Sequence, residues 1–166
     1  MSKSRTSASP LLSPEVTSAV HRQDYPALEQ LVTDATITLP DSSGRTVLSL
    51  VVNYGDAVML QWLLPQGPRL DQPDRNGWTA LHFAAQAHAV EKAALLLAAG
   101  ASVDVPDAYG NTPLWRATFE SRGRGEMLQL LLGHGANPDQ ANGSGVTPRQ
   151  LAETIANFDV KQFFTP

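Results

Sequence analysis

The sequence predicts an all-α solenoid, in which short antiparallel helix pairs stack in one row. Two sets of glycines support this prediction because they repeat at the same steps. Glycines that follow a turn lie 33, 33 and 35 residues apart, at Gly44, Gly77, Gly110 and Gly145. Glycines that follow a leucine-containing helix repeat at 33 and 35 residues, at Gly67, Gly100 and Gly135. This period is typical of arrays whose units cannot bury their apolar faces alone.

The chain is expected to begin with a leader and a capping helix pair. Residues 1–13 are rich in serine and offer little to bury, which predicts a disordered leader. Residues 14–40 follow as an N-terminal cap. Ser13-Pro14 suits the start of its first helix, because Ser is a good N-cap and Pro fits the first helical position. Asp24-Tyr25-Pro26 is expected to start the second helix.

The repeat units follow as 41–73, 74–106 and 107–141, with a C-terminal cap unit over 142–166. Each unit has a Thr after its turn glycine, where a helix N-cap is needed: Thr46, Thr79, Thr112 and Thr147. The unit 74–106 is the most regular. Its pattern predicts one helix over 79–87 and another over about 90–98, ended by Gly100 in the left-handed conformation.

Three local departures predict irregular structure. Pro65 should truncate the second helix of the first unit. Two extra residues within 119–125 (F-E-S-R-G-R-G) should lengthen the turn between the helices of the third unit and expose Arg122 and Arg124. Aromatic and aliphatic side chains of the C-terminal cap are expected to close the core, namely Phe158, Val160, Phe163 and Phe164.

The motifs T-A-L-H-F-A-A at 79–85 and T-P-L-W-R-A at 112–117, each followed by L-L-x-x-G, resemble the ankyrin repeat. The resemblance covers residues 14–166. It implies stacked helix-turn-helix units with projecting β-hairpin or turn fingers, and a binding surface on the concave face formed by fingertips and inner helices. The pattern departs at Trp115, which takes the place of the motif His, and at Arg149, which replaces the motif Leu.

Composition argues against several function classes. A net charge of −4 gives no electrostatic reason to expect nucleic acid or an anionic membrane as a partner. The absence of cysteine excludes disulfides, thiolate metal sites and a Cys nucleophile. No apolar run approaches the roughly 18 residues that indicate a membrane-spanning helix. We expect a soluble, cytoplasmic protein that is monomeric when free and uses no metal or cofactor.

The candidate chemical groups all have structural explanations that we favour over catalysis. His82 could be a general base, but a buried His bonded to backbone and to a Thr of a neighbouring unit is the better interpretation. Asp41, Asp74 and Asp107 occupy one repeat position and could form an acidic track. Such residues more often hold a turn through bonds to its own backbone. The sequence therefore predicts a protein that is not an enzyme.

Exposed aromatic and arginine side chains are the better indication of function, because these types are enriched in binding hot spots. The alternative is that Trp78 and Tyr109 simply stack between neighbouring fingers. The predicted partner-binding residues on the fingers are Arg45, Arg75, Asn76, Trp78, Tyr109 and Asn111. Those near the ends of the inner helices and in the inserted turn are Asn53, Tyr54, Gln86, Phe119, Glu120, Arg122 and Arg124.

The expected function is non-catalytic binding of another protein. Residues 110–126 and 145–160 resemble small stand-alone bacterial ankyrin proteins, some of which are similar to immunity proteins encoded beside secreted toxins. That resemblance implies a module that binds a toxin domain and blocks it. The alternative is a regulatory or scaffolding adaptor that recruits a partner without inhibiting it.

Overall fold

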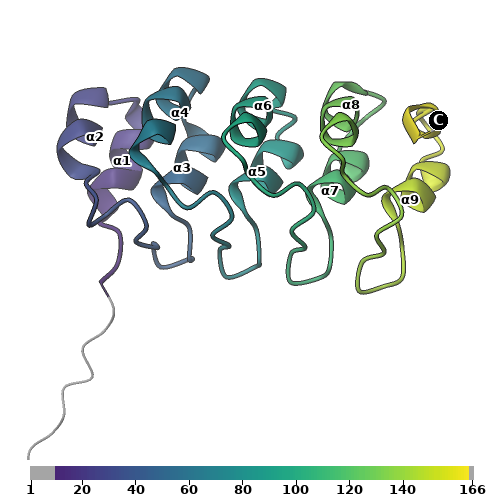
Figure 1. Cartoon of the computed structure of the whole chain (residues 1–166), viewed down its shortest axis with the longest axis horizontal. Helices are drawn as coiled ribbons and strands as arrows, with labels where there is room; N and C mark the ends of the chain where they lie inside the picture. The colour runs from purple at the N-terminus through teal and green to yellow at the C-terminus, as the bar shows by residue number, and fades with distance from the viewer. Residues whose placement is uncertain (1–9, 165–166) are drawn as a thin grey trace, which may run out of the picture.

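The computed structural model describes residues 10–164 as two parallel rows of short helices with finger-like turns on one side (Figure 1). The inner row contains α1 (Pro14–Arg22), α3 (Val47–Tyr54), α5 (Ala80–Gln86), α7 (Pro113–Phe119) and α9 (Pro148–Thr154). The outer row contains α2 (Tyr25–Leu31), α4 (Ala57–Leu63), α6 (Val90–Ala98), α8 (Glu126–Gly133) and the 3-10 helix η2 (Lys161–Phe164). No strand occurs in the described residues, and the predicted all-α solenoid is confirmed.

Helix starts and stops lie where the sequence predicts them. The hydroxyls of Thr46, Thr112 and Thr147 each accept a hydrogen bond from the backbone N–H three residues later. Such a bond satisfies one of the free donors at a helix N-terminus. Helix α6 ends at Ala98 and Gly100 adopts a φ of 98°. Pro65 has the predicted effect, since α4 ends at Leu63 and continues only as the 3-10 helix η1 (Leu64–Gln66).

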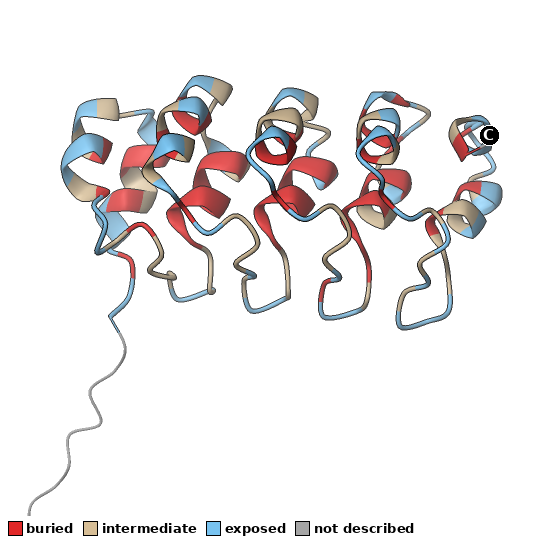
Figure 2. Cartoon of the chain, viewed as in Figure 1, coloured by how far each residue is buried: buried red, intermediate tan, exposed pale blue. Residues whose placement is uncertain are grey.

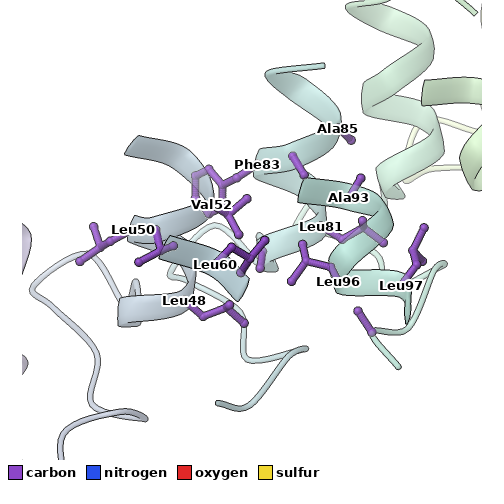
Figure 3. Close-up of a cluster of buried hydrophobic side chains, with 14 of the residues drawn as sticks. Leu48, Leu50, Val52, Leu60, Leu81, Phe83, Ala85, Ala93, Leu96 and Leu97 are labelled. Atoms are coloured by element: carbon purple, nitrogen blue, oxygen red, sulfur yellow. The ribbon is translucent and has the colours of Figure 1, made fainter. Parts of the chain in front are cut away.

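The core lies between the two rows, and each unit contributes a layer to it. Figure 3 shows this packing where the first and second units meet, with Leu48, Leu60, Leu81 and Leu96 among the buried side chains. Ala84 and Ala85 of α5 are fully buried, which lets neighbouring inner helices approach closely. Exposed residues lie along the fingertips and the outer surface of the helices (Figure 2).

Polar side chains also join neighbouring units. The Tyr25 hydroxyl donates to Asp56 Oδ1 at 2.8 Å, which links the N-terminal cap to the first unit. The Lys92 ammonium donates to the Gly55 carbonyl at 2.9 Å, at the C-terminal end of α3. Because each bond spans two adjacent units, the array is held by nearest-neighbour contacts, as in other solenoids.

The two ends of the array differ in part from the sequence prediction. Residues 1–9 of the predicted leader and residues 165–166 of the cap lie outside the described residues. Leu12 is only 5% exposed and its N–H donates to the Pro40 carbonyl at 2.9 Å, so ordered packing begins before residue 14. Val160 and Phe164 are buried, as predicted.

The prediction that Phe158 closes the core is wrong. Phe158 is 45% exposed because its ring covers the inserted turn from outside instead of entering between the helix rows. A Cβ atom on Gly123 would lie 2.8 Å from Phe158 Cδ1, and Phe163 covers Gly125 in the same way. The inserted turn and the C-terminal cap therefore pack against each other.

Gly77 should be more sensitive to substitution than its positive φ alone implies, because the next finger lies close to it. Gly77 has a φ of 80°, and a Cβ there would lie 2.5 Å from the Ala108 nitrogen of the next finger. Gly135 has a similar φ of 83° but nothing within 4 Å. We expect Gly135→Ala to lower the free energy of unfolding by about 1–2 kcal/mol.

Gly77→Ala should lower that free energy by a further ~1–3 kcal/mol, because the neighbouring backbone must move. Urea denaturation of both variants measures the difference. Equal losses would show that finger contact contributes nothing beyond the strain of a positive φ.

Candidate functional site

The fingers are closed by carboxylate or amide oxygens that accept bonds from their own turn. In the first finger, Asp41 Oδ1 accepts the N–H groups of Ser43 and Arg45 at 2.8 and 2.9 Å. The same pair of bonds, to residues two and four positions later, recurs from Asp74, Asp107 and Asn142. The structural interpretation of the aspartate ladder is confirmed.

Successive fingers are joined by one backbone hydrogen bond each. The N–H of Arg75 donates to the Ser43 carbonyl at 3.0 Å, and that of Ala108 donates to the Asn76 carbonyl at 2.9 Å. The Gly143 N–H donates to the Tyr109 carbonyl at 2.8 Å. These bonds fix the spacing of the fingertips, so the fingers and the inner helices form one surface, here called the inner face.

His82 is a structural residue in a buried bridge. Its Nδ1 accepts the N–H of Thr79 at 3.1 Å, and its Nε2 contacts the Asn111 carbonyl at 3.0 Å. A backbone N–H can only donate and a carbonyl can only accept, so Nε2 carries the proton. Burial lowers the pKa of His82, in spite of the bond to Asn111.

One detail of the His82 prediction is wrong. The threonine that His82 contacts is Thr79 of the same unit, and the neighbouring unit supplies a carbonyl instead. The reason is that the third residue of a helix folds back onto its own N-cap, which forms a capping box.

The finger tryptophan is packed into the array. The Arg116 guanidinium lies 4.6 Å from the centre of the Trp78 ring, and the Phe83 ring meets it edge-on at 5.1 Å. Arg116 Nη2 in turn donates to the buried Asp107 carboxylate at 2.7 Å. Burial alone would raise the pKa of Asp107, but the bonds from Arg116 and from two backbone N–H groups lower it below its ordinary value.

An aromatic groove lies at the C-terminal half of the inner face. The Trp115 and Phe119 rings of α7 are nearly parallel, with centroids 5.6 Å apart. Phe119 is 57% exposed, and Tyr109 on the third finger is 70% exposed. The hollow measures about 960 Å³. Arg116 of α7 also lines it, and its other walls come from the third and fourth fingers and from α9, including Asn111, Asn142, Val146, Leu151 and Thr154.

A second cluster lies at the N-terminal end of the inner face. Arg45 Nη1 donates to the Tyr54 hydroxyl at 3.2 Å, and the His21 ring lies 4.3 Å from the Tyr54 ring. Arg45 is also paired with Asp41 at 2.8 Å, which neutralises its charge. Arg45 and Asp41 line a hollow of about 670 Å³ with Leu11, Pro14, Thr17 and His21.

The structure brings some predicted binding residues together and separates others. Tyr109, Asn111 and Phe119 meet at the aromatic groove, although the Asn111 side chain is buried by its bonds to Asp107 and Asn142. Arg45 and Tyr54 share the N-terminal cluster. Between these two places, Arg75, Asn76 and Gln86 are exposed and Asn53 is partly buried.

The inserted turn is separate from the groove. Arg122 and Arg124 are exposed as predicted and Glu120 is partly so, but none of the three lines the hollow. Arg124 Nε donates to the Ser121 carbonyl at 3.2 Å, which keeps that side chain along its own turn.

Sequence reasoning missed Trp115 and Arg116 as parts of the site. The replacement of the motif His by Trp115 was the available signal, because a tryptophan cannot form the buried bridge that His82 makes. Within residues 10–164 no group of three or more His, Asp or Glu side chains is placed to hold a metal ion. Among the helices described, none has the length and hydropathy needed to cross a bilayer.

Comparison with known proteins identifies the repeat. A family model described as ankyrin repeats (3 copies) matches residues 17–107 and 51–142. Ankyrin repeat domain-containing protein 63 from Mus musculus is 31% identical over 118 residues, covering 66% of this chain and 30% of that protein. The protein of the same name from Homo sapiens is 30% identical over the same length.

Potassium channel AKT1 from Oryza sativa subsp. indica is 44% identical over 55 residues, which are 33% of this chain and 6% of the channel. The matches to the mouse and human proteins span 30% of their length.

The buried imidazole predicts a loss of stability in mild acid. The pKa of His82 lies below its ordinary value of 6.5 in the folded protein, so below about pH 6.5 the unfolded chain binds the proton more readily. The contribution of neutral His82 to the free energy of unfolding is therefore complete above pH 6.5. It falls as the pH drops toward the pKa of His82 in the folded protein. In the cap unit, Gln150 Oε1 accepts the Thr147 N–H at 3.0 Å, the bond that His82 makes with Thr79.

His82→Gln should keep that bond without titrating. We expect the wild type to lose more unfolding free energy than this variant between pH 8 and pH 5.5 in urea titrations. Burial also lowers the pKa of His88, but His88 is present in both proteins, so its effect on stability cancels in the comparison. Parallel pH profiles would contradict the assignment.

Proposed function

The chain belongs to the ankyrin-repeat family and is a protein–protein interaction module, and we propose that it binds one partner protein through the aromatic groove on its inner face. The observation that carries this proposal is the exposure of Tyr109 and Phe119 on two sides of one hollow. Large exposed apolar side chains around a concave site are characteristic of binding hot spots. The adjacent Trp115 ring, stacked on Phe119, forms a rigid wall.

The walls of the groove indicate the chemistry of the bound segment. Arg116 is the only charged residue among those lining the described hollow, and its charge is balanced by Asp107. An uncharged apolar segment therefore enters the groove without leaving a charge unpaired. The hydroxyl groups of Ser144 and Thr154 also line the hollow and are suited to accept bonds from the partner's backbone.

The N-terminal cluster and the residues between the two hollows form the remainder of the proposed interface. Arg75 and Asn76 on the second finger and Gln86 at the end of α5 are exposed between the two hollows. The Trp78 ring is covered by Arg116, so we propose that it positions the groove and does not touch the partner.

A narrower proposal names the kind of partner. Residues 110–126 and 145–160 resemble small stand-alone bacterial ankyrin proteins, some of which are similar to immunity proteins, and this supports a module that binds and neutralises a toxin domain. Under the alternative, the same inner face recruits a partner whose activity continues. A reconstituted assay separates the two, because an immunity protein abolishes the partner's activity at one-to-one stoichiometry and an adaptor leaves it intact. The absence of a toxin-like gene beside this one would count heavily against the immunity proposal.

Removing either exposed aromatic ring should weaken partner binding without unfolding the protein. We expect Tyr109→Ala and Phe119→Ala each to reduce affinity about tenfold or more, the size of a typical hot-spot loss. The partner is first identified by affinity purification with mass spectrometry, and its affinity is then measured by calorimetry.

Val58→Ala is the matched control, since Val58 is an exposed apolar side chain, 61% exposed, on the outer helix α4. It should bind like the wild type. Unchanged affinity in both aromatic variants would remove the groove from the interface.

A further inference from the structure

The row of fingers has a vacant bonding position at its C-terminal end. In each of the first three fingers, the carbonyl before the turn glycine accepts an N–H from the next finger. The equivalent carbonyl of the fourth finger belongs to Ser144. Within residues 10–164 no hydrogen bond reaches this oxygen.

The space around the turn glycines shows the same difference between the fourth finger and the first three. A Cβ on Gly44, Gly77 or Gly110 would lie 2.5–2.8 Å from the backbone nitrogen of the following finger. Gly145 has the same positive φ, 77°, but nothing within 4 Å of such a Cβ. The fourth finger thus has the backbone shape that receives a neighbouring turn, with that place open in the described structure.

The turns that follow the outer helices are joined to the next unit in a different way at this end of the array. Asp71 accepts the Ser102 N–H at 2.9 Å and Asp104 accepts the Asn137 N–H at 2.9 Å, each from the following unit. The third aspartate of this series, Asp139, is instead paired with Arg149 at 2.7 Å. Arg149 lies in α9, and the short helix η2 packs against α9 at this end of the array.

A second copy is a poor occupant of the vacancy. Stacking two copies end to end would bring α9 and η2 of one copy against α1 and α2 of the other. Helices α1 and α2 and the turn between them present exposed polar side chains at the other end of the array, including Glu15, Arg22, Gln23, Glu29 and Gln30. A single turn from another protein reaches the finger without burying those groups.

We propose that the fourth finger accepts an exposed backbone turn of the partner protein, whose free N–H donates to the Ser144 carbonyl. The inference rests on the proposed binding function and specifies how the partner is held. The geometry of the three internal contacts requires a turn with a free N–H, which Arg75, Ala108 and Gly143 supply within the array. Gly143 and Ser144 also line the aromatic groove, so this turn would place the adjacent segment of the partner there. Addition of a partner's strand to an open sheet edge is a recurrent mode of recognition. Here a turn would take the place of the strand.

The structure offers a blocking variant and a matched control. Asn tolerates positive φ better than other residues with a Cβ. Gly145→Asn therefore places a side chain on the open edge, and its Cβ would have no described atom within 4 Å. Gly135→Asn makes the same change at a φ of 83°, also with nothing within 4 Å, at the end of α8 away from the fingers. Circular dichroism and thermal melting should show that both variants fold.

The probe is a cyclic peptide with the sequence of residues 105–112, which contains the turn that the second finger binds through Ala108. We expect saturable NMR shifts at the Ser144–Gly145 peptide group in the wild type and in Gly135→Asn. Gly145→Asn should bind the peptide at least tenfold more weakly. The same peptide with an N-methyl group on its alanine lacks the donor and should bind as weakly.

No saturable shift at Ser144–Gly145, or equal binding by the N-methylated peptide, would overturn the inference. So would self-association of the free protein in sedimentation experiments that Gly145→Asn abolishes, because a second copy would then fill the edge. None of these results bears on Tyr109 and Phe119. If those two positions prove neutral toward the purified partner, the groove proposal fails separately.

Discussion

The fingers depend on one interaction, in which a side-chain oxygen accepts two backbone N–H groups of its own turn. Asp41, Asp74, Asp107 and Asn142 each make it. These bonds satisfy donors that would otherwise be left open where the chain reverses direction. A turn closed in this way brings its glycine against the next finger, and the following threonine then starts an inner helix. Finger spacing, helix register and the position of the aromatic groove all follow from it.

Much of the fold could be predicted because its determinants are local. Threonine caps, prolines in the first helical turn and helix-ending glycines act within a few residues, and they lie where the structure uses them. Phe158 shows the limit of this reasoning. Its ring packs against a turn 35 residues earlier, and no local pattern distinguishes that position from a place in the core.

The candidate site was harder to predict because side-chain partners come from neighbouring units. Trp78 and Tyr109 are both finger residues with aromatic side chains. Arg116 covers the first, whereas no ring or guanidinium covers the second among the described residues. Arginine and tryptophan are enriched in binding sites, so their presence alone suggests binding. In this protein some of them stabilise the array instead, as the ion pairs of Arg45 with Asp41 and of Arg116 with Asp107 show.

The seating of Phe158 and Phe163 on Gly123 and Gly125 limits how the protein can be rearranged by recombination. Repeat arrays generally tolerate exchange or duplication of single units, because each unit contacts only its neighbours through a common surface. Here the cap recognises an insertion that the other units lack. The third unit and the cap must therefore be exchanged together. A chimera that keeps only one of them would leave either the aromatic rings of the cap or the glycine backbone of the inserted turn uncovered.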